Sequence, residues 1–298
     1  MSLRDRFDKR PVLLEVIPPG RRASEAYIKR YIEKYLTKAL DFMEFDAINI
    51  PEIVDENFRG EPFYRNVEPR DFASMGRTAC GDREVVVSKI VVHCRGGRPE
   101  LEDWATATLQ GYGIQNVVAV GAYLPDFDYP GPGVLEANEV LKAAGLTCGN
   151  VMIPEREGEA QKMLGKTLGG AEFFTTQAVF SSGLFVEVLE GYYALCVEAG
   201  ISPAAVFASF TPVSEKYDIE FLRWLGVSID AVTEGRLLAG GKEDLARASI
   251  EMALENWRKL QSAASRHKGA VLGLNVEYIH RHNFEPTLDM AKRLVREI

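Results

Sequence analysis

The sequence predicts an α/β protein that folds as a single (β/α)8 TIM barrel over residues 1–298. Three observations predict it: eight short apolar runs rich in β-branched residues, helical periodicity between the runs, and glycines where helices should end. The runs are nearly continuous in apolar residues, as in parallel strands that are covered on both faces. Their bounds are Val12–Ile17, Phe45–Ile50, Val85–His93, Gln115–Gly121, Thr147–Ile153, Glu172–Gln177, Ala204–Ser209 and Ala270–Val276.

The stretches between these runs have the period of amphipathic helices, in which one apolar stripe faces a sheet. An early stripe is made by Ile28, Ile32, Tyr35 and Ala39. A later stripe is made by Ala246, Ile250, Ala253, Trp257 and Leu260. Glycines that precede a run, and so end a helix, are Gly113, Gly145, Gly170 and Gly200.

Two stretches depart from a regular strand–helix alternation. The interval between the seventh and eighth runs is unusually long, so we expect extra helices there, with a break at Gly240–Gly241. The segment Val54–Pro69 is rich in charge and turn residues and is predicted to be a long loop over the top of the barrel. The alternative fold is an open doubly wound sheet. That fold would place a glycine-rich phosphate turn after its first strand, where this chain has Pro18-Pro19-Gly20.

Composition limits the class of partner. The chain has 35 basic and 43 acidic residues and a formal net charge of −8. A net negative surface argues against nucleic acid or an anionic membrane, and it leaves a small-molecule ligand as the expected partner. The charged amino-terminal segment lacks the apolar core of a secretory signal, and no apolar run approaches the ~20 residues that span a bilayer.

The four cysteines, at positions 80, 94, 148 and 196, contain no CxxC pair. This spacing gives no zinc pattern, and we expect reduced and mostly buried thiols. Reduced thiols predict a cytoplasmic location. The sequence leaves open a homo-oligomer or a place as a subunit of a complex.

Candidate site residues are expected where strands end and the following loops begin, since function gathers there in this fold. Glu15 interrupts the first apolar run, and a carboxylate in that position must be paired, solvated or protonated. A raised pKa near the top of the barrel would make Glu15 a proton donor. The alternative is a polar core residue tied to a neighbouring Lys or Arg.

Other polar residues follow later runs. The amide of Gln177 is suited to read a paired donor and acceptor on a ligand, or else it is an ordinary polar strand end. Lys166 lies on the helix before that strand and is a further candidate site residue. The alternative is an ordinary helix lysine exposed to solvent. Glu277, His280 and His282 invite a metal interpretation, but their spacing is not a helical ligand pair, and no metal is expected.

Several segments resemble the methylenetetrahydrofolate reductases. They begin with Leu-Glu-Val-Ile-Pro-Pro at Leu14–Pro19, continue through Gly113–Val120, and reach Gly169–Gln177, where the most specific motif, Gly-Ala-x-Phe-x-x-Thr-Gln, ends. Ala208–Val213 and Gly273–Asn283 are also similar. The resemblance covers most of the chain in order.

The resemblance implies a (β/α)8 flavoprotein that reduces a folate-bound methylene group to methyl, with FAD as cofactor and NAD(P)H as co-substrate. By position, Glu15 matches the general acid that opens the five-membered ring of the folate. Gln177, Thr176 and Tyr278 are assigned to substrate binding. The residues assigned to the cofactor are His93, Gly121, Ala122, Tyr123, Glu155 and Lys166.

The loop after the fourth strand departs from the family. The family has Ala-Leu-Arg-Gly-Asp-Pro there, whereas this chain reads Ala-Val-Gly-Ala-Tyr-Leu-Pro over residues 119–125, without the arginine and the aspartate. We therefore expect weak FAD binding at best. One alternative function is a non-redox folate-binding or methyl-shuttling subunit that has lost flavin. Another is an unrelated barrel lyase or hydrolase that uses Glu15.

Overall fold

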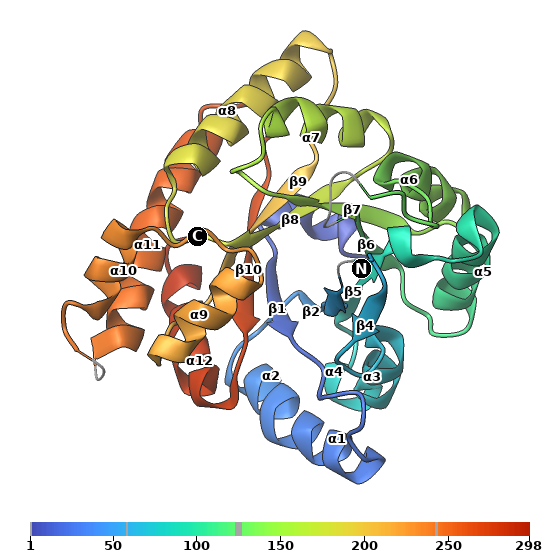
Figure 1. Ribbon diagram of the computed structural model, residues 1–298. Helices are drawn as coiled ribbons and strands as arrows, with labels where there is room; N and C mark the ends of the chain where they lie inside the picture. The colour runs from blue at the N-terminus through green and yellow to red at the C-terminus, as the bar shows by residue number, and fades with distance from the viewer. Residues whose placement is uncertain (1, 58, 123–126, 242–243) are drawn as a thin grey trace. The chain divides into compact units, whose positions relative to one another are not determined.

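The computed structural model describes residues 2–57, 59–122, 127–241 and 244–298. Within these ranges, parallel strands form a closed barrel in the order β1-β10-β9-β8-β7-β6-β5-β2 (Figure 1). The predicted (β/α)8 class is therefore confirmed. The barrel strands are β1 (Val12–Val16), β2 (Ala47–Ile50), β5 (Glu84–Ile90), β6 (Asn116–Val120), β7 (Thr147–Met152), β8 (Phe173–Ala178), β9 (Ala205–Phe210) and β10 (Leu272–Tyr278).

Helices occupy the connections between strands, as the periodicity predicts. The first connection is a helix in three parts, because a π-helical turn (Ile32–Thr37) separates α1 (Glu25–Tyr31) from α2 (Lys38–Phe42). Ser24 caps α1 by accepting a hydrogen bond from the Tyr27 amide. The others are α3 (Pro69–Met75), α4 (Arg77–Cys80), α5 (Gly97–Gln110), α6 (Val134–Ala143), α7 (Glu159–Leu168), α8 (Gly183–Glu198), α9 (Lys216–Trp224), α10 (Ala231–Leu238), α11 (Leu245–Ala264) and α12 (Phe284–Val295).

The stretch from Val54 to Pro69 is not the continuous loop that its composition predicts. It contains an antiparallel hairpin of β3 (Val54–Glu56) and β4 (Pro62–Tyr64), and Pro69 is the first residue of α3. The Glu68 side chain caps α3 by accepting from the amides of Arg70 and Asp71. Local pairing and capping thus order a segment that is rich in turn residues.

The third predicted strand also ends earlier than expected. The sequence predicts a strand through His93, but β5 ends at Ile90 and residues Val91–His93 form a 3-10 turn. The Ile90 amide donates to the carboxylate of Glu52 at 2.6 Å. Because the Ile90 amide, the last of the strand, donates to a side chain and not to a neighbouring strand, the chain leaves the sheet at this point.

Contacts divide the chain into two compact units, each with its own core. The first unit consists of Met1–Arg6, Glu15–Val151 and Gly165–Phe174. The second consists of Phe7–Leu14, Met152–Leu164 and Thr175–Ile298. Fully buried side chains include Phe45, Phe72 and Phe173 in the first unit and Tyr192, Phe210 and Trp257 in the second. The expectation of a single domain stays a prediction.

The second unit contains the extra helices that the spacing predicts. After β9 come α9, α10 and α11, and α10 and α11 are separated at Gly241, whose φ of 79° favours glycine. The 20-residue α11 packs against α8 and α12 (Figure 1). Four residues of its predicted apolar stripe are buried and Ala246 is half-buried. The Trp257 ring meets Phe210 of β9 edge-on at 6.1 Å.

One close approach in the first unit depends on glycine. A Cβ at Gly149 of β7 would lie 2.4 Å from the Phe173 ring at the start of β8. Real Cβ atoms do not approach so closely, so the aromatic ring occupies the space that any side chain at Gly149 would need.

The cysteines behave as expected. All four thiols are free and buried. Burial raises the pKa of Cys148 to about 12, and that of Cys80 to about 11. Among the described residues, no helix combines the length and the apolar character needed to cross a bilayer.

Candidate functional site

Glu15 lies one residue before the end of β1, where its strand is otherwise buried. Its Oε2 accepts a hydrogen bond from Nδ2 of Asn49 at 2.7 Å. Asn49 belongs to β2 and is 2% exposed. The carboxyl group is thus oriented by a neutral amide, which fixes one of its oxygens as an acceptor.

A buried ion pair follows β2. Glu52 accepts from Nζ of Lys89 at 3.2 Å, and the two side chains are 5% and 12% exposed. Burial on its own lowers the pKa of Lys89, but the charge and hydrogen bond of Glu52, together with the nearby Tyr64 and Cys94, outweigh burial and the pKa is raised. Sequence reasoning missed this pair, although Lys89 interrupts an apolar run as Glu15 does.

His93 lies in a closed polar cluster of the first unit. Its Nε2 is 2.9 Å from Oε1 of Glu56, and the hydroxyl of Tyr129 donates to Oε2 of the same carboxylate. The side chains of His93 and Glu56 are 1% and 6% exposed. We call Glu56, His93 and Tyr129 the Glu56 cluster. Among the described residues, the buried Nδ1 of His93 has no hydrogen-bond partner.

Gln177 and Glu155 line one cavity in the second unit, of about 120 Å³. Gln177 is one residue from the end of β8, and its Nε2 donates to the Leu225 carbonyl at 3.1 Å. The cavity wall also contains Phe180 and Asp230. A residue assigned to substrate and one assigned to cofactor thus share one small cavity.

Thr176 and Tyr278 are buried by contacts within the protein. The Thr176 hydroxyl donates to the Gln177 carbonyl at 2.9 Å and accepts from the Ser209 amide at 3.0 Å. Tyr278 is 3% exposed, and its ring lies edge-on to Phe284 at 5.4 Å. Their assignment to substrate binding stays a prediction.

Several of the residues assigned to FAD are engaged by contacts within their own unit. The Nζ of Lys166 donates to the Val151 carbonyl at 2.9 Å. A Cβ at Gly121 would lie 2.8 Å from Val134, Ala122 is exposed, and Tyr123 is outside the described residues. The cavity beside Glu155 is also well below the ~300–1,000 Å³ of typical ligand pockets. FAD binding stays a prediction.

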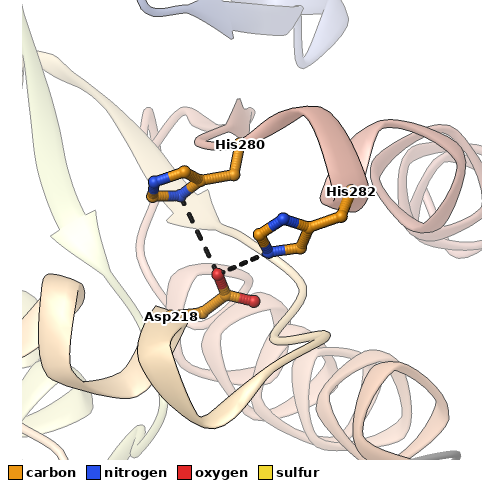
Figure 2. A group of neighbouring side chains, drawn as sticks. All are labelled: Asp218, His280 and His282. Atoms are coloured by element: carbon orange, nitrogen blue, oxygen red, sulfur yellow. Dashed lines mark hydrogen bonds and ion pairs between the residues drawn. The ribbon is translucent and has the colours of Figure 1, made fainter.

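Two histidines that follow β10 meet an aspartate from α9, as Figure 2 shows. The Oδ1 of Asp218 is 2.8 Å from Nε2 of His282 and 3.8 Å from Nδ1 of His280. We call these three residues the Asp218 cluster. Proximity along the chain groups the histidines with Glu277, but the carboxylate beside them is that of Asp218. Only the fold brings together residues that are more than 60 positions apart.

Comparison with protein-family models and with curated proteins gives no match. Solved structures share the fold. An uncharacterized protein from Clostridium thermocellum, which binds two copies of 5-methyl-5,6,7,8-tetrahydrofolic acid, has a TM-score of 0.81 and 18% identity over 99% of this chain and 100% of that one. A GH113 β-1,4-mannanase has a TM-score of 0.56 and 7% identity, covering 97% and 99% of the two chains. A thermostable aldo-keto reductase in complex with epalrestat has a TM-score of 0.53 and 13% identity, covering 94% and 89%.

Proposed function

We propose that this chain binds a reduced folate carrying a one-carbon group and reduces a folate-bound methylene group to methyl. The observation that carries the proposal is Glu15, a carboxyl at the end of a buried strand that an amide holds in place. The resemblance of the sequence to the methylenetetrahydrofolate reductases supports it. The full-length fold likeness to a protein that binds 5-methyltetrahydrofolic acid supports the ligand class.

In the proposed reaction, Glu15 is the general acid. Its Oε2 accepts from Asn49, so the acidic proton is carried on the other oxygen. Transfer of that proton to a ring nitrogen of the folate breaks the bond from nitrogen to the methylene carbon and leaves an iminium ion. Hydride from NAD(P)H then adds to the iminium carbon, which becomes the methyl group while the nicotinamide is oxidised. Hydride can come directly from NAD(P)H, so no step is routed through FAD.

Gln177 is proposed as a ligand contact. Its amide offers both a donor and an acceptor, and it lines a cavity. We expect Gln177→Ala to weaken binding of the folate, and to change turnover at saturating folate much less.

The test is Glu15→Gln, which keeps the shape of the side chain and removes its proton. We expect the oxidation of NADPH or NADH that depends on methylenetetrahydrofolate to fall by ~10²-fold or more, within the range of general acid catalysis. Binding of 5-methyltetrahydrofolate, measured by calorimetry, should be retained. The matched control is Glu172→Gln, because Glu172 precedes β8 and pairs with Arg4 at the surface. A melting temperature that falls while turnover per folded molecule is unchanged would make Glu15 structural.

A second candidate function is a non-redox folate carrier. It is favoured by the poor fit of the flavin residues, and by a fold neighbour that holds the methylated, fully reduced folate. The same assay separates the two functions. A carrier binds 5-methyltetrahydrofolate and gives no folate-dependent oxidation of NAD(P)H with either nucleotide.

A further inference from the structure

The Asp218 cluster has the donor set of a metal site. It presents one carboxylate oxygen and two imidazole nitrogens, and these three atoms lie within 4.8 Å of one another. The residues come from two elements at the carboxyl ends of neighbouring strands: Asp218 from the first turn of α9, after β9, and the histidines from the segment after β10. Neither element would supply a site by itself.

The Asp218 carboxylate is held as a rigid anion. It is fully buried, and its Oδ2 accepts from the amides of Ser214 and Glu215 at 2.8 and 2.9 Å and from Nδ2 of Asn283 at 3.0 Å. Burial tends to raise the pKa of Asp218, but these hydrogen bonds and that from His282 lower it overall. One oxygen is thus fixed by protein donors while Oδ1 faces the imidazoles. Outer hydrogen bonds of this kind orient metal ligands.

His280 presents a nitrogen that the described protein does not use. Its Nδ1 is buried and has no hydrogen-bond partner, since Oδ1 of Asp218 is 3.8 Å away. An imidazole nitrogen that makes no hydrogen bond can offer its lone pair to a metal ion. The ring is fixed edge-on against Phe221 and Tyr217, with centroids 4.9 and 5.7 Å away. It also stacks on His282 with an angle of 13° between the planes.

A helix cap alone accounts for only part of this arrangement. The cap explains the bonds at Oδ2, and a single imidazole at Oδ1 would complete the carboxylate. It does not explain a second, stacked imidazole whose Nδ1 lies 3.8 Å from the same oxygen, within ion-pair distance but without a hydrogen bond (Figure 2).

We propose that Asp218, His280 and His282 bind a divalent transition-metal ion of the zinc type. Two imidazoles and one carboxylate form the ligand set of three-ligand zinc sites, which leave a further position for water or a substrate. Metal–ligand bonds of ~2.0–2.2 Å require donor atoms ~3.3 Å apart, between the 2.8 and 3.8 Å observed here. To reach that spacing, Nε2 of His282 must move away from Oδ1 of Asp218 and Nδ1 of His280 must move toward it, each by about 0.5 Å. The two histidine side chains are 35% and 29% exposed.

The experiment titrates metal-free protein with Zn²⁺ by calorimetry and with Co²⁺ by its visible absorption. We expect one site per chain, with nitrogen ligation in the cobalt spectrum. His280→Ala and His282→Ala should each weaken metal binding by at least ~10-fold. Replacing residues that only hydrogen-bond to metal ligands already costs ~10-fold to 100-fold, so loss of a ligand itself should cost no less. The matched control is His267→Ala, because His267 packs on the Tyr193 ring and is outside the cluster.

His280→Ala is the decisive variant, since it removes a nitrogen that makes no hydrogen bond and so should leave the fold intact. Equal affinity in wild type and His280→Ala would overturn the proposal, and so would the absence of a site in wild type. The result does not depend on the proposed folate chemistry, because Glu15→Gln should bind the metal as wild type does even if folate binding is never detected.

Discussion

The Glu56 cluster and the Asp218 cluster contain the same chemical pair, a carboxylate beside an imidazole, in two different settings. In the first, the two side chains are 1% and 6% exposed, and a tyrosine hydroxyl occupies the second carboxylate oxygen. In the second, Asp218 is fully buried while its two imidazoles are 29% and 35% exposed. The buried pair, whose carboxylate oxygens both have partners, is suited to stabilising the core. The pair with partly exposed imidazoles can accept a further ligand.

The largest effect that we expect is the loss of stability in the variant Asp218→Ala. This change removes the acceptor of four hydrogen bonds, including those of two main-chain amides in the turn before α9. We expect the free energy of unfolding to fall by about 3 kcal/mol, because hydrogen bonds to charged groups contribute about 1.5–3 kcal/mol each and water replaces some of them. Chemical denaturation measures it.

Asp244→Ala is the control for that experiment. Asp244 precedes α11, its side chain is 39% exposed, and it makes an ion pair with Arg247. Its loss should change the free energy of unfolding by no more than about 0.5 kcal/mol. Similar losses in the two variants would show that the Asp218 bonds contribute little.

Replacing one histidine in each cluster sharpens the comparison. His93→Ala should cost about 2 kcal/mol, since it opens a cavity and removes the imidazole partner of Oε1 of Glu56. His280→Ala, without metal, should cost less than about 1 kcal/mol, because its Nδ1 makes no hydrogen bond. Thermal unfolding of the two variants in the presence of a chelator compares them. Equal losses of stability in the two variants would contradict the distinction between the buried Glu56 cluster and the partly exposed Asp218 cluster.

The smallest expected effect is a pH dependence. The folded-state pKa of Asp218 is lowered, so the stability that its ionisation contributes is present above the unfolded value of 3.8 and is lost as the pH falls through the lower folded value. The difference in stability between wild type and Asp218→Asn should therefore be constant from neutral pH down to about pH 4 and shrink below it. Urea unfolding at a series of pH values tests this. A difference that already shrinks near pH 6 would assign the linkage to a histidine.

The sequence was sufficient for the barrel because its signal is local. A run such as Ala204–Ser209 is apolar up to its final serine, and β9 follows it to within one residue. The extra helices before β10 were also predicted, from spacing and from Gly240–Gly241.

The polar clusters could not be predicted in the same way, because their partners are far apart in the chain. Glu56 meets His93 across 37 positions, and Asp218 meets His282 across 64. No periodicity records such pairs. The early end of β5 could not be predicted for the same reason. The amide of its last residue, Ile90, donates to the side chain of Glu52, which is 38 positions away in the chain.

The ring of Phe173 over Gly149 couples the residues that these two positions can hold. A methyl group at 149 would overlap the ring, so an alanine there requires a smaller residue at 173 in the same step or before it. In a double-mutant cycle, Gly149→Ala should be costly alone and much less costly beside Phe173→Leu. We therefore expect relatives that keep this strand pair to conserve the combined volume at the two positions, even where neither residue is retained.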